Sequence, residues 1–250
     1  MSTGPSTGTA AAGGRAARAQ LAELAADRRF LSDWGLARGD LDAASARPAA
    51  VLVLFGVLDD LAADHDAQAL AVAQDLDVLL LERAATLRSH AGQVAFPGGR
   101  AEDGEGPVDA ALREAVEETG LDAGGVEVLG TLAQLPMPVS NHLVTPVLGW
   151  WARPTPVRVV DVAESAHVFR APVADLLDPD HRVTTVLRRA GRTWRGPGFE
   201  VLDGAGVPHL VWGFTAGILD AAFDRLGWTE PWDTGREREL RADGTGDRRR

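Results

Sequence analysis

The chain has 250 residues, a formal net charge of -11, 45% hydrophobic residues and 24% charged residues. This is the composition of a soluble globular protein, long enough for one large domain or two small ones. The negative charge argues against general binding to nucleic acid or anionic membranes. The absence of cysteine excludes disulfides, thiolate metal sites and cysteine nucleophiles. Because no apolar run approaches the roughly 20 residues of a membrane span, we expect a cytoplasmic protein.

The first 14 residues are small, polar and glycine-rich, which predicts a disordered N-terminal tail. Leu21, Leu24 and Leu31 then recur at helical spacing and predict a helical extension over residues 15–35. Short apolar runs predict buried strands at 49–58 and 77–83. Further strands are expected at 126–135, 142–151, 158–170, 183–187 and 198–202, and further helices at 172–177 and 211–226.

The segment from residue 229 to 250 is charged and poor in apolar residues, so we expect a mobile C-terminal tail. No internal repeat and no linker divides the residues between the two tails. The sequence therefore predicts a single domain over residues 15–228.

The most informative segment spans residues 99–121 and follows a turn signal, Phe96-Pro97-Gly98-Gly99. Pro107 suits the first turn of a helix, and Gly120 suits its left-handed C-terminal cap. Between them, apolar residues recur at i, i+3, i+4 and i+7, which predicts one buried helical face. The residues of this apolar stripe are Val108, Ala111, Leu112 and Ala115.

Three carboxylates, those of Glu114, Glu117 and Glu118, lie on the opposite side of this predicted helix. Carboxylates this close repel one another unless a cation lies between them. Hard oxygen ligands suit Mg²⁺ or Mn²⁺, and Mg²⁺ is commonly bound together with substrate phosphates. The pattern favours a metal-dependent enzyme acting on a phosphate compound, although an acidic run alone is more often a solvated helix face.

The flanking residues make the acidic run part of a longer motif. Gly99, five residues, Glu105, seven residues and then REAVEETGL from Arg113 to Leu121 resemble the Nudix box at every fixed position. The resemblance implies an α+β fold, an α/β/α sandwich with a central mixed β-sheet in which the box forms a loop–helix–loop. It also implies hydrolysis of a nucleoside diphosphate linked to another group, with Mg²⁺ or Mn²⁺ as cofactor.

The resemblance also implies roles for individual residues. The implied metal ligands are Glu114, Glu117, Glu118 and the carbonyl of Gly98. Arg113 and Glu105 are expected to orient the carboxylates, and Arg113 is also placed to pair with Glu117 at i+4. A metal held there can polarise a phosphoryl oxygen, activate water and neutralise the leaving group.

The residues before the box resemble the signature of one Nudix subfamily, the coenzyme A diphosphatases. Arg83, Arg88, Gly92 and the Phe96–Gly99 turn match its order and spacing, whereas Leu81 replaces the usual Thr. Segments 138–150 and 211–220 also resemble this subfamily. The resemblance implies cleavage of the pyrophosphate of coenzyme A to 3′,5′-ADP and 4′-phosphopantetheine.

Coenzyme A carries three phosphates, so its site needs cations besides the metal. Arg83 and Arg88 are candidates, because guanidinium geometry suits phosphate, with ordinary surface arginines as the alternative. His90 and Gln93 are candidates for hydrogen bonds to phosphate or for structural roles.

Two residues are candidates for the general base, Glu114 and Glu164, because Nudix enzymes take this residue from the box or from a later loop. The segment ESAHVFRAP, which begins at Glu164, resembles the region where the subfamily has a glutamate. A surface glutamate is the alternative. A base must lie within hydrogen-bond reach of the attacking water, which spacing alone does not establish.

Two other functions compete with the first. Pro136 lies 16 residues after Gly120, roughly where Nudix hydrolases of ADP-ribose carry a proline. A catalytically silent, nucleotide-sensing Nudix domain is the other alternative, disfavoured because every box carboxylate is present. The expected partner is a nucleotide of the coenzyme A type, free, acylated or oxidised. The number of metals and the oligomeric state, including a homodimer, stay open.

Overall fold

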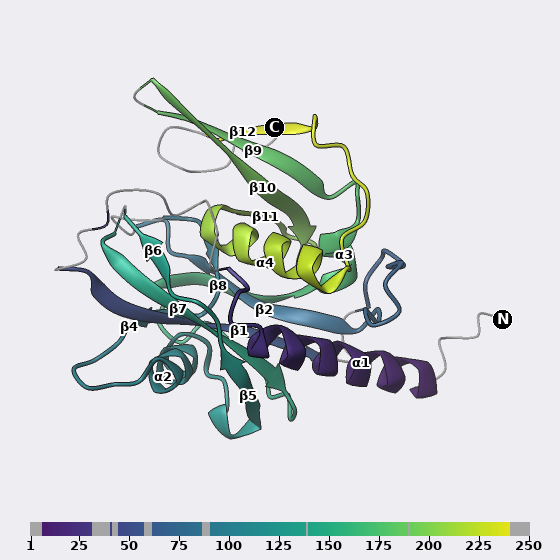
Figure 1. The fold of residues 1–250 in the computed structure, drawn as a ribbon, viewed down its shortest axis with the longest axis horizontal. Helices are drawn as coiled ribbons and strands as arrows, with labels where there is room; N and C mark the ends of the chain where they lie inside the picture. The colour runs from purple at the N-terminus through teal and green to yellow at the C-terminus, as the bar shows by residue number, and fades with distance from the viewer. Residues whose placement is uncertain are drawn as a thin grey trace.

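The computed structural model describes residues 7–31, 41, 45–57, 62–86, 91–138, 140–189 and 191–240. These residues form two β-sheets and four α-helices (Figure 1). The helices are α1 (Thr7–Ala26), α2 (Pro107–Thr119), α3 (Val173–Leu177) and α4 (Gly213–Leu226), and a short 3₁₀ turn, η2, spans Ala123–Gly125.

The central sheet has eight strands and both parallel and antiparallel pairs. Its strands are β1 (Arg47–Val57), β2 (Leu76–Arg83), β3 (Val94–Ala95), β4 (Gly98–Arg100), β5 (Val126–Thr131), β6 (Leu135–Met137), β7 (His142–Trp151) and β8 (Ser165–Pro172). The main order is β3-β2-β1-β7-β5, and β4, β6 and β8 pair with β1, β7 and β2. Strands β1 and β7 run parallel, whereas their other neighbours are antiparallel. The predicted mixed sheet is confirmed.

The second sheet has four strands in the order β11-β10-β9-β12. Its strands are β9 (Arg182–Arg189), β10 (Arg192–Leu202), β11 (Pro208–Trp212) and β12 (Glu237–Leu240). Helix α4 lies between this sheet and the central sheet (Figure 1). The predicted helix at 211–226 begins late, because β11 continues to Trp212 and Gly213, at φ 68°, starts α4.

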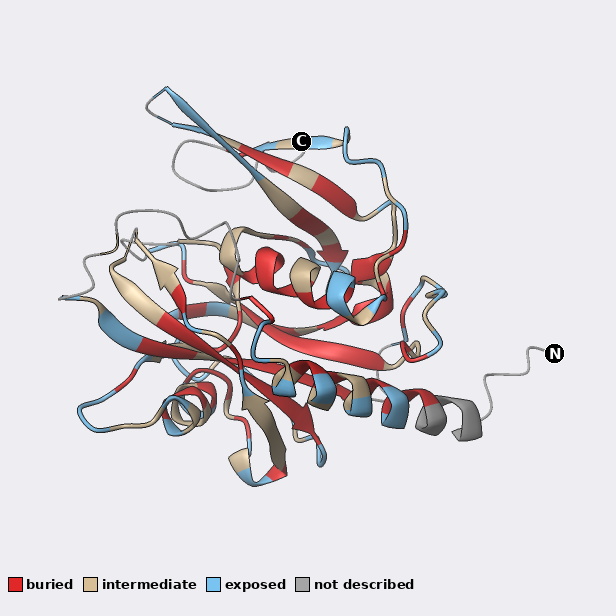
Figure 2. Cartoon of the chain, in the orientation of Figure 1, coloured by how far each residue is buried: buried red, intermediate tan, exposed pale blue. Residues whose placement is uncertain are grey.

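The central strands are buried on both faces (Figure 2). Alternate residues of β1 face opposite sides, as the pleat requires. Val53 and Phe55 belong to the larger core, which contains residues of α1 and α4. Leu52 and Leu54 belong to the smaller core beneath α2. The result is the α/β/α layering that the box resemblance implied.

Helix α2 and its flanking turns form the predicted loop–helix–loop. Pro107 occupies the first helical position, and Gly120 ends the helix at φ 69° in the left-handed region. Ala110, Ala111 and Ala115 are buried against the sheet. Because alanine is small, the helix axis lies close to β1 and β4, and its polar face stays outward.

The expected N-terminal tail is wrong in part, because α1 begins at Thr7. Two glycines that suggested disorder lie where the helix packs most closely. A β-carbon at Gly13 would lie 3.1 Å from Cβ of Ala73, and one at Gly14 would lie 2.6 Å from Cγ2 of Val57. Glycine here permits close helix packing. Residues 1–6 lie outside the described residues.

The predicted helical extension over 15–35 also ends earlier than expected. Helix α1 stops at Ala26, and the chain turns through Asp27, whose carboxylate accepts the Arg29 N–H at 3.0 Å. Leu21 and Leu24 are buried as their spacing predicted. Residues 32–35 lie outside the described residues.

The expected mobile C-terminal segment is also wrong over residues 229–240. Strand β12 pairs in parallel with β9, and Leu240 is buried. Arg182 is buried between the rings of Phe199 and Trp232, with cation–π distances of 4.6 and 4.7 Å. These contacts attach residues 229–240 to the second sheet. Because the segment has few aliphatic residues, its composition wrongly predicted mobility. Residues 241–250 lie outside the described residues.

Candidate active site

The three box carboxylates differ in their exposure. Glu118 is buried, with 5% of its surface exposed, and its Oε2 accepts the backbone N–H of Gly98 at 2.8 Å. The Glu117 side chain is 59% exposed, and that of Glu114 lies between these extremes. The three side chains therefore form a graded acidic face that runs from the sheet into solvent.

Two glycines before α2 let backbone approach these carboxylates. Gly98 has φ 156°, and a β-carbon there would lie 2.3 Å from the carbonyl oxygen of Ala50 in β1. A β-carbon at Gly99 would lie 2.5 Å from Oε1 of Glu114. Only glycine fits both positions without displacing a neighbour. The Phe96–Gly99 turn thus presents its backbone directly to the acidic face.

Arg113 links the acidic face to Glu105 and to the backbone before α2. Its Nε and Nη2 donate to the two oxygens of Glu105 at 2.9 and 3.0 Å. Its Nη1 donates to Glu114 at 3.1 Å and to Glu117 at 3.2 Å, and Nη2 also reaches the carbonyl of Arg100 at 3.0 Å. Glu105 lies outside the acidic face and fixes the guanidinium. The Arg100 carbonyl was not anticipated from the sequence.

Burial governs the electrostatics of the site. Burial raises the pKa of Glu118 to about 7, although the Gly98 N–H and Arg83 oppose the shift. Burial also raises the pKa of Glu114, against the opposing effect of Arg113. The Arg113 hydrogen bonds hold the pKa of Glu105 below its usual value. A buried carboxylate beside two others is stabilised by a cation, so this oxygen-rich set fits a divalent metal.

A later loop covers the C-terminal end of α2. The Arg158 N–H donates to the carbonyl of Thr119 at 2.9 Å, and the Val160 N–H donates to the carbonyl of Glu118 at 3.3 Å. Helix carbonyls at this end have no partner within the helix, so the loop supplies donors. These bonds bring the residues before β8 back to the box.

Glu164 and Arg83 lie beside the acidic face because of this loop. The Ala84 N–H donates to the carbonyl of Glu164 at 2.8 Å, next to the β2–β8 irregularity at Arg83. Burial is the main cause of the raised pKa values of Glu114 and Glu118, and the negative charge of Glu164 raises both further. Two predicted residues from outside the box are therefore close to it.

The other predicted substrate contacts are less defined. Arg88 and His90 lie outside the described residues. The backbone carbonyl of Gln93 accepts the Arg83 N–H at 3.0 Å, so Gln93 neighbours Arg83 through its main chain. Their roles stay predictions.

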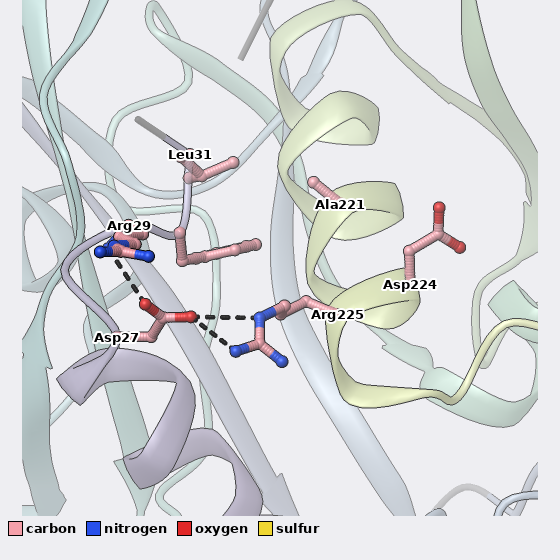
Figure 3. Close-up of a pocket in the computed structure, with 7 residues that line it drawn as sticks. Asp27, Arg29, Leu31, Ala221, Asp224 and Arg225 are labelled. Carbon is pink, nitrogen blue, oxygen red and sulfur yellow. Dashed lines mark hydrogen bonds and ion pairs between the residues drawn. The ribbon is translucent and has the colours of Figure 1, made fainter. Parts of the chain in front are cut away.

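A hollow elsewhere on the molecule is distinct from this site. A cavity of about 780 Å³ lies between the turn after α1 and helix α4 (Figure 3). Its lining residues are Asp27, Arg29, Phe30, Leu31, Ala221, Asp224 and Arg225. The Asp27 carboxylate bonds Arg225 at 2.8 and 3.1 Å across its rim (Figure 3). None of the predicted site residues is among its lining residues.

The raised pKa of Glu118 predicts how the metal-free protein responds to pH. Because the folded pKa, about 7, exceeds the ordinary value of 4.5, the folded state binds this proton more tightly than the unfolded state. The stability from this proton is fully present below pH 4.5 and is lost as pH rises through 7. Glu118→Gln should therefore be stabilised relative to the natural chain by about 2 to 3 kcal/mol more at pH 8 than at pH 5.

Urea unfolding of both proteins in EDTA at pH 5 and pH 8 measures this difference in free energy of unfolding. Other titrating groups contribute equally to both proteins and cancel. A difference that does not vary with pH would show that Glu118 titrates in the folded protein as it does in a free peptide.

A mixed sheet that carries a loop–helix–loop with a partly buried carboxylate cluster suits a hydrolase of phosphoric anhydrides. Comparison with known proteins gives the family. Residues 64–184 match the NUDIX domain family model. The chain is 39% identical over 143 residues to the Uncharacterized Nudix hydrolase NudL of Shigella boydii serotype 4 (strain Sb227), covering 57% of this chain and 71% of that protein. The protein of the same name from Shigella flexneri is 38% identical over 153 residues, covering 61% and 76%.

Among solved structures, the Nudix hydrolase RenU of M. smegmatis is 26% identical with a TM-score of 0.40, covering 53% of this chain and 74% of its own. The family assignment rests on the two sequence relatives. The chain belongs to the Nudix hydrolase family, whose members hydrolyse phosphoric anhydrides and generally use divalent metal ions. Among the described helices, none combines the length and apolarity needed to cross a membrane.

Proposed function

We propose that the chain hydrolyses the pyrophosphate bond of coenzyme A or its derivatives in the cytoplasm, giving 3′,5′-ADP and 4′-phosphopantetheine. The observation that carries the proposal is the position of Arg83, the first residue of the upstream signature. Its positive charge acts on Glu118, and its Nε is buried without a hydrogen-bond partner among the described residues. A bound phosphate would satisfy this buried donor, because a guanidinium suits a phosphate oxygen.

Glu114, Glu117, Glu118 and the carbonyl of Gly98 would hold Mg²⁺ or Mn²⁺ in this proposal. When bound, such an ion polarises a phosphoryl oxygen, lowers the pKa of water and offsets the negative charge of the leaving phosphate. Arg113 and Glu105 keep the carboxylates oriented toward the ion. Arg83 binds a phosphate of the substrate at the inner end of the acidic face, and Arg88 and His90 stay candidates for further phosphate contacts from the sequence alone.

Glu164 is the general base in this proposal. Its carboxylate makes no hydrogen bond or ion pair within the described part of the chain, whereas that of Glu114 is held by Arg113. Glu164 takes a proton from the attacking water, the water oxygen bonds to phosphorus, and the bridging P–O bond breaks. The bridging oxygen leaves with the second phosphate.

A substrate panel tests the proposal. With Mg²⁺ or Mn²⁺, the kcat/KM for coenzyme A should exceed that for ADP-ribose. Arg83→Gln should lower kcat/KM for coenzyme A by about 10- to 100-fold, because one charge-assisted bond to phosphate is lost. Arg195→Gln, at the exposed start of β10, is the control and should leave the rate unchanged. Efficient cleavage of ADP-ribose with coenzyme A untouched would overturn the specificity while leaving the family assignment intact.

A further inference from the structure

A second cluster of ionisable side chains lies on the face of the central sheet opposite α2. Glu82 and His167 are cross-strand partners on β2 and β8, so their side chains share one face. Glu82 contacts His209, whereas the charge of the adjacent Arg83 acts on Glu118 of the box, so the two side chains lie on opposite faces of the sheet. Asp203, after β10, and His209, on β11, approach from the second sheet. The cluster therefore joins the two sheets and is separate from the box carboxylates.

Three of these residues direct metal-binding atoms at one point. The ligand atoms of His167, Asp203 and His209 lie within 4.8 Å of one another. Oδ2 of Asp203 lies 2.5 Å from Nε2 of His167 and 3.4 Å from Nε2 of His209. Tetrahedral zinc with bonds of 2.0–2.1 Å has ligand atoms roughly 3.3 Å apart, so small side-chain movements suffice.

The ligand atoms are held by their surroundings. Oδ1 of Asp203 accepts the N–H groups of Ala205 and Val207, both at 2.8 Å, which leaves Oδ2 for the histidines. The ring of Phe169 stacks on His209 at 4.0 Å between centroids and 11° between planes. A metal site needs ligands positioned in this way, because flexible ligands must be ordered when the ion binds.

Glu82 sets the chemical state of His209. Oε2 of Glu82 lies 3.0 Å from Nδ1 of His209, so Nδ1 carries a proton that it donates to the carboxylate. In the neutral ring, Nε2 then presents a lone pair to the carboxylate oxygen of Asp203. A metal ion or a proton between these two lone pairs relieves their repulsion. Metal-ligating histidines in proteins almost always have such an outer carboxylate or carbonyl partner.

Burial and access also suit an ion. Asp203 and His209 are buried, with 6% and 5% of their surfaces exposed. The His167 side chain is 39% exposed, so an ion can enter from solvent on that side.

We propose that His167, Asp203 and His209 bind a divalent transition ion of the zinc type, with Glu82 as the outer partner of His209 and water as the fourth ligand. Mixed imidazole and carboxylate ligands favour Zn²⁺, Co²⁺ or Ni²⁺ over Mg²⁺. The ion cross-links β8 of the central sheet to strand β11 and the β10–β11 turn of the second sheet. The site is independent of the proposed substrate.

Cobalt titration tests the site without an activity assay. The full chain carrying Glu118→Gln, which weakens the box site, is titrated with Co²⁺ and followed by visible absorption. We expect one equivalent to give the strong bands of tetrahedral cobalt, and Zn²⁺ but not an excess of Mg²⁺ should abolish them. Absence of tetrahedral bands, or their removal by Mg²⁺, would overturn the proposal.

Variants in the same background assign the ion to the cluster. His167→Gln should abolish the bands, and Glu82→Gln should weaken Co²⁺ affinity about 10- to 100-fold, as outer-partner changes do. His181→Gln is the matched control, because its ring is similarly exposed (34%) and lies 4.0 Å from a carboxylate, that of Asp178, outside the cluster. Circular dichroism checks folding. Unchanged bands in both His167→Gln and Glu82→Gln would contradict the assignment.

Discussion

Glu118→Gln is expected to lower kcat by about two to four orders of magnitude while the protein stays folded. Glu118 is the most buried of the three box carboxylates, and its Oε2 is fixed by the Gly98 N–H at 2.8 Å. The glutamine carbonyl can still accept this bond, so the loop keeps its position. What is lost is the negative charge that would hold the metal in the proposed site. The change removes activity through charge and leaves the shape nearly intact.

Steady-state assays with saturating Mg²⁺ and Mn²⁺ measure this effect. Glu23→Gln on the exposed face of α1 is the matched control and should keep the natural rate. In EDTA at alkaline pH, the Glu118→Gln protein should be more stable than the natural chain, because the natural chain must bury the charged Glu118 carboxylate, whose pKa is raised. A rate near that of the natural chain would contradict the proposal that Glu118 binds the metal.

Gly98→Ala is expected to destabilise the protein by about 3 kcal/mol or more, a cost in the range of severe backbone clashes. Its β-carbon would lie 2.3 Å from the Ala50 carbonyl oxygen and 2.6 Å from Cα of Val51. Both are backbone atoms of β1, the strand at the centre of the sheet, and cannot move cheaply. Thermal and urea unfolding measure the loss.

Gly99→Ala is the informative neighbour of that variant. Its β-carbon would meet the carboxylate of Glu114 at 2.5 Å, and this is the movable end of a side chain. We expect stability within about 1 kcal/mol of the natural chain but a kcat at least about 10-fold lower, because the carboxylate is displaced. Equal stability of Gly98→Ala and Gly99→Ala would contradict the close backbone contact of Gly98 with β1.

The box was predictable because its signals are local. Pro107, the alanines of one face and Gly120 define α2 without reference to distant residues. The spacing of Arg113 and Glu117 likewise predicts their pairing, which occurs at 3.2 Å. Short-range periodicity therefore suffices for the helix, its caps and its acidic face.

Residues supplied by distant segments were harder to place. Glu164 approaches the box because the Arg158 and Val160 N–H groups bond the end of α2, and that loop has no periodic pattern. The cluster of His167, Asp203 and His209 was missed for the same reason, since two sheets must pack before these residues meet. Resemblance to a family pointed to Glu164, whereas no sequence signal pointed to the cluster.

The chain termini were misjudged from composition. Glycines in α1 indicated disorder, yet Gly13 and Gly14 lie where Ala73 and Val57 leave no room for a side chain. Strand β12 has few apolar residues and is stabilised by pairing with β9 and by charged pairs such as Arg188–Glu239 at 2.6 Å. Removing residues 233–250 would therefore delete a strand. Whether residues 15–228 behave as one domain stays a prediction.

In the proposed function, the box of this chain cleaves the pyrophosphate of coenzyme A. The most direct test is chromatography of coenzyme A incubated with the full chain and Mg²⁺ or Mn²⁺. We predict equimolar 3′,5′-ADP and 4′-phosphopantetheine, formed only with metal and abolished by EDTA or Glu118→Gln. Intact coenzyme A after incubation with either metal, in a preparation that cleaves another nucleoside diphosphate derivative, would contradict the claim.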